Sequence, residues 1–174
     1  MTPAMPRLRT RYYFDTVTLS NFALSDRLGL LVRRYGKRLH ITHEVLAEIS
    51  AGAVGGYPSL LNVEALAFRG VFTMASPMTS RRERTLFRTF LQTIDPGEAS
   101  CLACASVRGG IIATDDRAAR EICRSQGIHV TGTIGILKTC CDDGALRLDE
   151  ADRILDSMVS QGYRSPVARI SDLE

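Results

Sequence analysis

The sequence lacks any stretch that approaches the roughly 18 continuous apolar residues of a membrane-spanning helix. Its first eleven residues carry prolines and arginines but no apolar signal core. We therefore expect a cytoplasmic protein with no membrane association. The chain has 174 residues, of which 45% are hydrophobic, so it can bury one good core but is short for two. We expect a flexible basic leader (1–10), a single domain (11–163) and a C-terminal tail (164–174).

A disulfide framework is also missing. The five cysteines are an odd number and have no framework spacing. Cys101 and Cys104 form a Cys-x-x-Cys pattern, but no second Cys or His pair completes a zinc site. They lie about one helical turn apart. We therefore interpret them as core residues.

Lysine is scarce, because only Lys37 and Lys138 occur and the other twenty basic residues are arginines. The net charge of +3 is by itself no evidence of nucleic-acid binding. The planar guanidinium group of arginine nevertheless suits phosphate. The arginines cluster within residues 7–11, 33–38 and 81–88. Each cluster is by default a solvated face, although three of them around an acidic centre would suit a polyanionic substrate.

What the sequence does contain is a set of apolar strands that stop at carboxylates. An aromatic run stops at Asp15, and a helical pattern follows it. An Asp in this place is a favoured helix N-cap whatever the function. The cap and active-site interpretations therefore both stay open.

The same pattern recurs at residues 110–117, where the strand ends on two acids, Asp115 and Asp116. Adjacent aspartates repel each other unless a cation, arginines or helix amides offset the charge. Asp115 alone would suffice to cap the helix expected at 117–126. The capping interpretation then gives Asp116 no structural role.

Two glutamates occupy similar places. A strand at 38–42 leads into a helix at 43–49 that carries Glu44 in its first turn, and a glycine-rich loop is expected at 51–58. Glu98 follows Asp95 and Pro96 in a pattern that resembles a capping box. A structural role and a metal-binding role for Glu98 both remain open.

Strands alternate with helices along the whole chain, which indicates an α/β fold with a mostly parallel sheet. The carboxyl ends of parallel strands share one edge, so these acids should converge there. A hard divalent cation, Mg²⁺ or Mn²⁺, would offset their charge and could activate water against a phosphodiester. Thr16 and Thr114 would orient the carboxylates or the water.

The ordered set of motifs resembles the PIN domain family from about residue 12 to 163. The motifs are Tyr13-Phe14-Asp15-Thr16 with Asn21, the segment around Glu44, Gly97-Glu98-Ala99, the run from Ala113 to Arg117, and the run from Gly132 to Leu137. The resemblance implies a three-layer α/β/α sandwich and a Mg²⁺- or Mn²⁺-dependent ribonuclease.

The resemblance also implies roles for individual residues. The catalytic acids would be Asp15, Glu44, Glu98 and Asp116, and the metal would be bound by Asp15, Glu98, Asp115 and Asp116. Glu98 stands where Asp is more usual, as in a Gly-Glu-Ala branch of the family. Thr16, Asn21 and Thr114 would orient these acids. Arg81, Arg82 and Arg117 would bind RNA.

Many prokaryotic members, the VapC-like proteins, are toxins of toxin-antitoxin pairs. An antitoxin protein and a second copy of the chain are therefore expected partners besides RNA. The last helix, residues 148–162, could serve as a dimer seam or an antitoxin docking face, but core is the default interpretation.

Two other interpretations remain. One is a PIN-like module that binds RNA or protein without cutting, because Glu98 fails to complete the metal site. The other is an aspartyl-phosphate phosphotransfer domain, which is also a parallel sheet with acids at strand ends. The dehalogenase-like pattern needs a second Asp two residues after the first, and here that residue is Val17.

Overall fold

The computed structural model describes residues 10–173, so the expected basic leader lies outside the described residues apart from Thr10. Five short strands form one parallel sheet in the order β3-β2-β1-β4-β5. The strands are β1 (Tyr12–Phe14), β2 (Leu39–Ile41), β3 (Thr73–Met74), β4 (Ile111–Ala113) and β5 (Val130–Thr131). The chain builds outward from β1 to β3 and then returns to place β4 on the other side of β1. The carboxyl ends of β1 and β4 therefore form a topological switch point, where ligands bind in such sheets.

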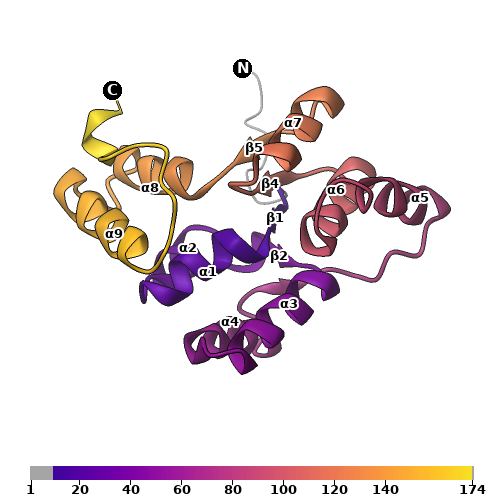
Figure 1. Cartoon of the computed structure of the whole chain (residues 1–174), viewed down its shortest axis with the longest axis horizontal. Coiled ribbons are helices and arrows are strands. Elements are labelled where there is room, and N and C mark those ends of the chain that lie inside the picture. Colours follow the sequence, from indigo (N-terminus) through magenta and orange to yellow (C-terminus); the bar gives the residue numbers. More distant parts are fainter. Residues whose placement is uncertain (1–9, 174) are drawn as a thin grey trace, which may run out of the picture.

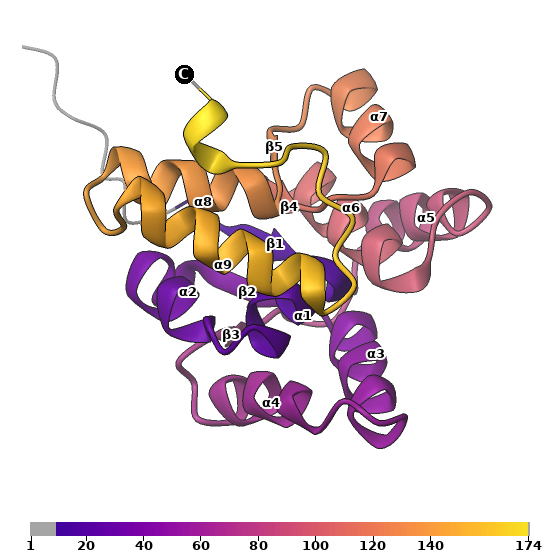
Figure 2. The ribbon, with the colours of Figure 1, turned by 60° about the vertical axis from the view of Figure 1, so that its left-hand side comes forward.

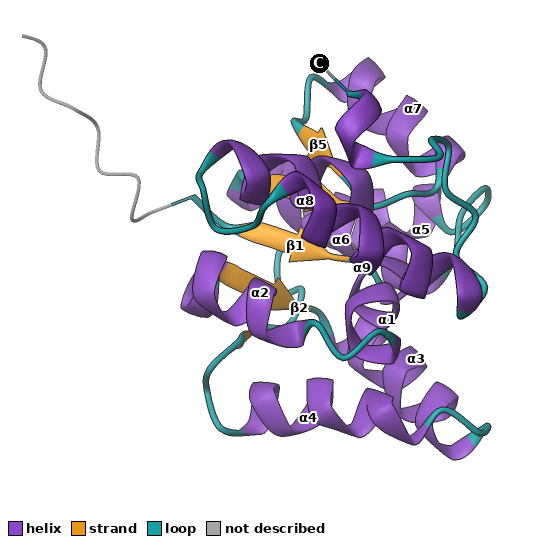
Figure 3. Ribbon diagram, turned by 90° about the vertical axis from the view of Figure 1, so that its left-hand side faces the viewer, coloured by secondary structure: helices purple, strands orange, loops and turns teal. Residues whose placement is uncertain are grey.

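Helices cover both faces of this sheet (Figure 3). They are α1 (Thr16–Leu24), α2 (Leu28–Arg34), α3 (His43–Val54), α4 (Leu61–Phe68), α5 (Arg81–Phe90), α6 (Pro96–Arg108), α7 (Arg117–Gln126), α8 (Thr133–Asp142) and α9 (Leu148–Ser160), with 3-10 turns at Gly36–Arg38, Pro58–Leu60 and Ile170–Asp172. In Figure 1, α1, α2, α8 and α9 lie to one side of the strands and α5, α6 and α7 to the other, in agreement with the packing of α8 on α9 and of α5 on α6. The three-layer α/β/α sandwich is confirmed.

The central strand β1 lies in the middle of the core. Tyr13 and Phe14 are 1% and 0% exposed, and Leu39 and Ile112 on the flanking strands are equally buried. A strand that is buried on both faces has a continuous apolar sequence. This explains why the strand was recognisable from its sequence and why it stops at the first charged residue.

The third helix is longer than expected. The sequence predicted a helix at 43–49 and a loop at 51–58, but α3 continues to Val54. Gly52 lies within this helix, next to Leu60, whose Cδ1 would lie 2.7 Å from a Cβ at position 52. The glycine thus allows close packing, and the irregular segment is shorter than predicted.

The C-terminal segment packs against α9. Ile170 is fully buried, and its N–H donates to the Asp152 carboxylate at 2.7 Å, as does the Ser171 hydroxyl. Leu155 and Met158 on α9 are 0% and 1% exposed. The default interpretation of α9 as a core helix is therefore confirmed. Across residues 10–173, no helix combines the length and apolar character that crossing a bilayer requires.

Candidate active site

Asp15 directly follows β1 and is the N-cap of α1. Its Oδ1 accepts the Thr18 N–H at 2.7 Å, so the cap interpretation is correct. Its Oδ2, however, is buried and accepts no hydrogen bond from any residue in 10–173. Burial, with a smaller contribution from the charge of Asp115, raises the pKa of Asp15 to about 6 against the lowering effect of the nearby Thr114 and Thr18. One oxygen therefore caps the helix, and the other is buried without a hydrogen-bond partner among the described residues.

Glu98 lies in the first turn of α6 and forms the expected capping box. Its Oε2 accepts the Asp95 N–H at 3.2 Å. Burial, with smaller contributions from the charges of Asp15, Asp116 and Asp95, raises the pKa of Glu98 to about 7. Asp15 and Asp116, which follow β1 and β4, therefore lie close enough to Glu98 on α6 for their charges to act on it.

The second of the adjacent aspartates, not the first, caps the following helix. Asp116, not Asp115, caps α7, since its Oδ1 accepts the Ala119 N–H at 2.7 Å. Its own N–H donates to the Thr114 hydroxyl at 3.1 Å. Thr114 thereby orients the backbone of Asp116. The prediction that Asp115 is the cap is wrong, because the chain turns one residue later than assumed.

Asp115 instead links α1 to α8. Its Oδ1 accepts the Thr133 N–H at 2.9 Å, and its Oδ2 accepts the Thr133 hydroxyl at 2.5 Å and the Asn21 amide at 3.4 Å. Asn21 also donates to the Thr133 hydroxyl at 3.0 Å. Both oxygens of Asp115 are thus engaged by the protein itself.

Glu48 was not among the residues predicted from the sequence. This residue lies one turn after Glu44 on α3, and its carboxylate accepts both the Thr16 hydroxyl and, at 2.8 Å, the Gly97 N–H. A Cβ on Gly97 would collide with this carboxylate. Glu48 therefore joins the first turns of α1 and α6 beside the acids. The glycine of Gly-Glu-Ala was the available signal, because it indicated a close approach by another group.

Glu44 lies elsewhere. It lines a separate cavity of about 630 Å³ together with Arg84 and Arg88 of α5. No hydrogen bond joins Glu44 to Asp15 or to any other described acid. The structure thus places Glu48, rather than the predicted Glu44, against the first turns of α1 and α6.

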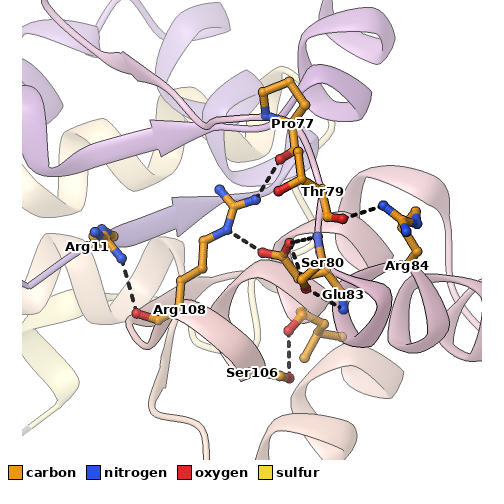
Figure 4. Close-up of polar contacts among 9 residues, drawn as sticks. Arg11, Pro77, Thr79, Ser80, Glu83, Arg84, Ser106 and Arg108 are labelled. Carbon is orange, nitrogen blue, oxygen red and sulfur yellow. Dashed lines mark hydrogen bonds and ion pairs between the residues drawn. The ribbon is translucent and has the colours of Figure 1, made fainter.

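The arginines predicted to bind RNA do not lie together. One lies at the carboxyl ends of the strands and two lie near their amino ends. Arg117 is exposed next to Asp116 at the carboxyl edge and pairs with Glu121 at 3.2 Å. Arg81 and Arg82 begin α5 at the opposite edge. There Glu83 pairs with Arg108, whose carbonyl accepts from Arg11 just before β1 (Figure 4).

The cysteines take no part in the site. Cys101 and Cys104 are buried on α6, and burial raises the pKa of both thiols, well above the ordinary value for Cys101. All five cysteines are unpaired. The interpretation of Cys101 and Cys104 as core residues is confirmed.

The donor set fits Mg²⁺ or Mn²⁺ in chemistry and charge. The groups that share the site are carboxylates, and Asp15 contributes a buried oxygen without a partner. Within residues 10–173, no three His, Cys, Asp or Glu side chains are already close enough to form a metal-binding group. The fit is therefore one of donor chemistry, not of a preformed coordination sphere.

A family model and a solved structure are similar to this chain. The search of curated proteins found no match. Among solved structures, the crystal structure of PAE2754 from Pyrobaculum aerophilum is similar, with 15% sequence identity, a TM-score of 0.48, and coverage of 71% of this chain and 91% of that chain. A family model described as a PIN domain matches residues 12–173. Since this match includes nearly the whole chain, the protein belongs to the PIN domain family.

Proposed function

We propose that the protein is a Mg²⁺- or Mn²⁺-dependent endoribonuclease that hydrolyses RNA phosphodiester bonds at Asp15, Glu98 and Asp116. The observation that carries the proposal is the pKa of Glu98, raised to about 7 by burial and by the charges of Asp15 and Asp116. Acids that are held together at the expense of stability are characteristic of functional sites. The PIN family membership supports a nuclease-type function.

Asp15, Glu98 and Asp116 would hold the cation, with Asp15 Oδ2 as its most available oxygen. A bound divalent cation would activate water and stabilise the leaving oxygen of the phosphodiester. The positive ends of α1, α6 and α7 point toward these acids, because Asp15, Asp95 and Asp116 cap those helices. The helix ends favour the ionised carboxylates and would also favour a phosphate group.

Asp115 and Glu48 would act as positioning residues rather than ligands. The two oxygens of Asp115 already accept from Thr133 and Asn21. Glu48 joins the first turns of α1 and α6 through Thr16 and Gly97. Through these bonds, Asp115 and Glu48 fix the elements that carry Asp15, Glu98 and Asp116. Carboxylates that support metal ligands in this way contribute about 10- to 100-fold to activity.

The test is cleavage of a labelled single-stranded RNA, a structured RNA and a DNA of the same sequence, with Mn²⁺, with Mg²⁺ and with chelator. Wild type is compared with Asp15→Asn and Asp116→Asn, and with Asp156→Asn as a control because Asp156 is exposed on α9. We expect metal-dependent RNA cleavage by wild type and by Asp156→Asn only. Equal inactivity of all four folded proteins would overturn the proposal and favour a binding module.

We also propose a toxin role, with an antitoxin as partner, and self-association of the chain. The family resemblance motivates both, and exposed apolar side chains around the α3–α4 connection support a protein partner. Val54 and Tyr57 there are 91% and 55% exposed. Growth arrest on expression, relieved by Asp116→Asn, would test the toxin role. A monomeric mass by light scattering at micromolar concentration would rule out the dimer.

A further inference from the structure

A cationic cavity adjoins the acidic centre. It has a volume of about 600 Å³ and lies between α7, the end of β5 with the first turn of α8, and the segment after α9. Figure 2 shows that segment, in yellow, turning back toward β5. Asp115 lines this cavity and immediately precedes Asp116 of the candidate active site. Four arginines line it as well: Arg117, Arg120, Arg124 and Arg164.

One of these arginines is fixed in place by the sheet. Arg120 Nη1 donates to the carbonyl oxygens of Thr114 at 2.7 Å and Thr131 at 3.1 Å. Thr114 directly follows β4 and Thr131 is the last residue of β5. The charge of Arg120 is therefore held at the carboxyl edge of the sheet. A Cβ on Gly132 would lie 3.0 Å from the same nitrogen. The glycine therefore gives this guanidinium group the space that it occupies.

The carboxylates of the cavity leave two of its arginines, Arg124 and Arg164, without an ion pair among residues 10–173. Asp115 is engaged by Thr133 and Asn21, and Glu121 pairs with Arg117. Arg124 and Arg164 are exposed, and neither forms an ion pair with any residue in the described part of the chain. The cavity thus offers two uncommitted guanidinium groups beside a third that is held rigid.

The lining of the cavity favours phosphate over a nucleobase. Tyr163 is the aromatic residue of its lining, but this residue is only 9% exposed and therefore presents little surface for stacking. Gly132 and Gly135 provide backbone without side chains. Arginines recognise phosphate through charge-assisted, often bidentate hydrogen bonds.

We propose that this cavity binds the phosphodiester backbone of the RNA strand next to the bond that is cut. The inference rests on the proposed function, since it assigns a substrate subsite to that centre. Arg124 and Arg164 contact the RNA backbone, and Arg120 supplies a fixed charge at the carboxyl edge of the sheet. Because backbone contacts carry no sequence information, the subsite is indifferent to the base at that position.

The test measures RNA binding separately from cleavage. A labelled single-stranded RNA is titrated in chelator with the Asp116→Asn chain, alone and combined with Arg124→Ala/Arg164→Ala. The charge-matched control carries Arg69→Ala/Arg153→Ala, two exposed arginines outside the cavity. Thermal unfolding confirms that all three chains are folded. Oligo(A) and oligo(U) are compared to test base dependence.

We expect Arg124→Ala/Arg164→Ala to weaken binding about tenfold or more at low salt, equally for both oligonucleotides. The slope of log Kd against log salt should fall by about 1.4 for two lost phosphate contacts. The control pair should change Kd by less than about twofold. In the cleavage-competent chain, the cavity pair should raise KM much more than it lowers kcat.

A loss of binding no greater than that of the control would overturn the inference, as would no RNA binding by the Asp116→Asn chain. A loss confined to one oligonucleotide would overturn the backbone assignment. These outcomes are independent of the proposed function, which fails instead if wild type cuts no RNA with either metal.

Discussion

Asp15 has two carboxylate oxygens in different surroundings, and this difference separates its two roles. Oδ1 accepts the Thr18 N–H as an ordinary helix cap, whereas Oδ2 is buried without a partner among the described residues. An asparagine can keep the cap acceptor while it loses the charge. The difference in stability between Asp15→Asn and the wild type therefore measures the free-energy cost of the buried charge.

We expect Asp15→Asn to gain stability relative to wild type as the pH rises. The pKa of Asp15 is raised from 3.8 to about 6 in the folded chain, so folding favours the neutral acid. The contribution of Asp15 to the free energy of unfolding is complete below about pH 4. The wild type loses up to about 3 kcal/mol of it as the pH rises through about 6. Asparagine stays neutral throughout. Urea unfolding in chelator from pH 4 to 8 measures the difference, and a flat difference like that of Asp156→Asn would contradict this reasoning.

Gly97 provides a second test at a single residue. A methyl group there would displace the Glu48 carboxylate from the Gly97 N–H and the Thr16 hydroxyl. We expect Gly97→Ala to cost about 1.5–3 kcal/mol for the lost charged hydrogen bonds, and to lower cleavage about 10- to 100-fold. Chemical unfolding and RNA cleavage measure the two effects.

The matched control is Gly29→Ala in α2, where no atom lies within 4 Å of the new methyl group. It should be neutral or stabilising by about 0.5–1 kcal/mol and fully active. If Gly97→Ala behaved like Gly29→Ala in both assays, Glu48 would have no positioning role.

At the scale of elements, helix N-termini hold the acids at the carboxyl edge of the sheet. Asp15 begins α1 and Asp116 begins α7, while Glu98 lies in the first turn of α6. The positive ends of these helices offset part of the repulsion between the carboxylates. Capping and catalysis thus use the same residues, which is why the sequence alone could not decide between them.

Asp116 allows the two roles to be separated within one element. Asp116→Asn should retain the bond to the Ala119 N–H and remain nearly as stable as wild type, while Asp116→Ala should lose about 1 kcal/mol with the cap. Both variants should be inactive, because the charge is lost in each. Thermal unfolding and RNA cleavage provide the comparison. An active, destabilised Asp116→Ala would show that the residue is only a cap.

The elements themselves could be predicted, because strands such as β1 are apolar throughout and helices such as α9 have one apolar face. The choice between Glu44 and Glu48 could not, since both lie on the same face of α3 and only the packing against α6 decides which one approaches the site. The choice between Asp115 and Asp116 depended on where the chain turns after β4. The sequence around Gly52 predicted a loop because glycine is unfavourable within a helix. Its close packing against Leu60, which follows the next turn, is visible only in the folded chain.

At the scale of the whole molecule, the sheet order brings distant segments to one edge. β1 and β4 are neighbours although about 100 residues separate them, and α6 packs across both. The acids therefore come together only in the folded chain. Any cation that they bind must then favour the folded state over the unfolded state.

We expect Mg²⁺ or Mn²⁺ to raise the melting temperature of wild type. At a metal concentration 100 times Kd, the stabilisation is about 2.7 kcal/mol, which corresponds to roughly 5–10 °C for a chain of this length. Asp15→Asn and Asp116→Asn should lose most of the shift, whereas Asp156→Asn should keep it. Differential scanning fluorimetry with metal and with chelator makes the measurement. A shift of equal size in all four proteins would place the bound metal outside the acidic centre, because only a site that includes Asp15 and Asp116 links their charge to global stability.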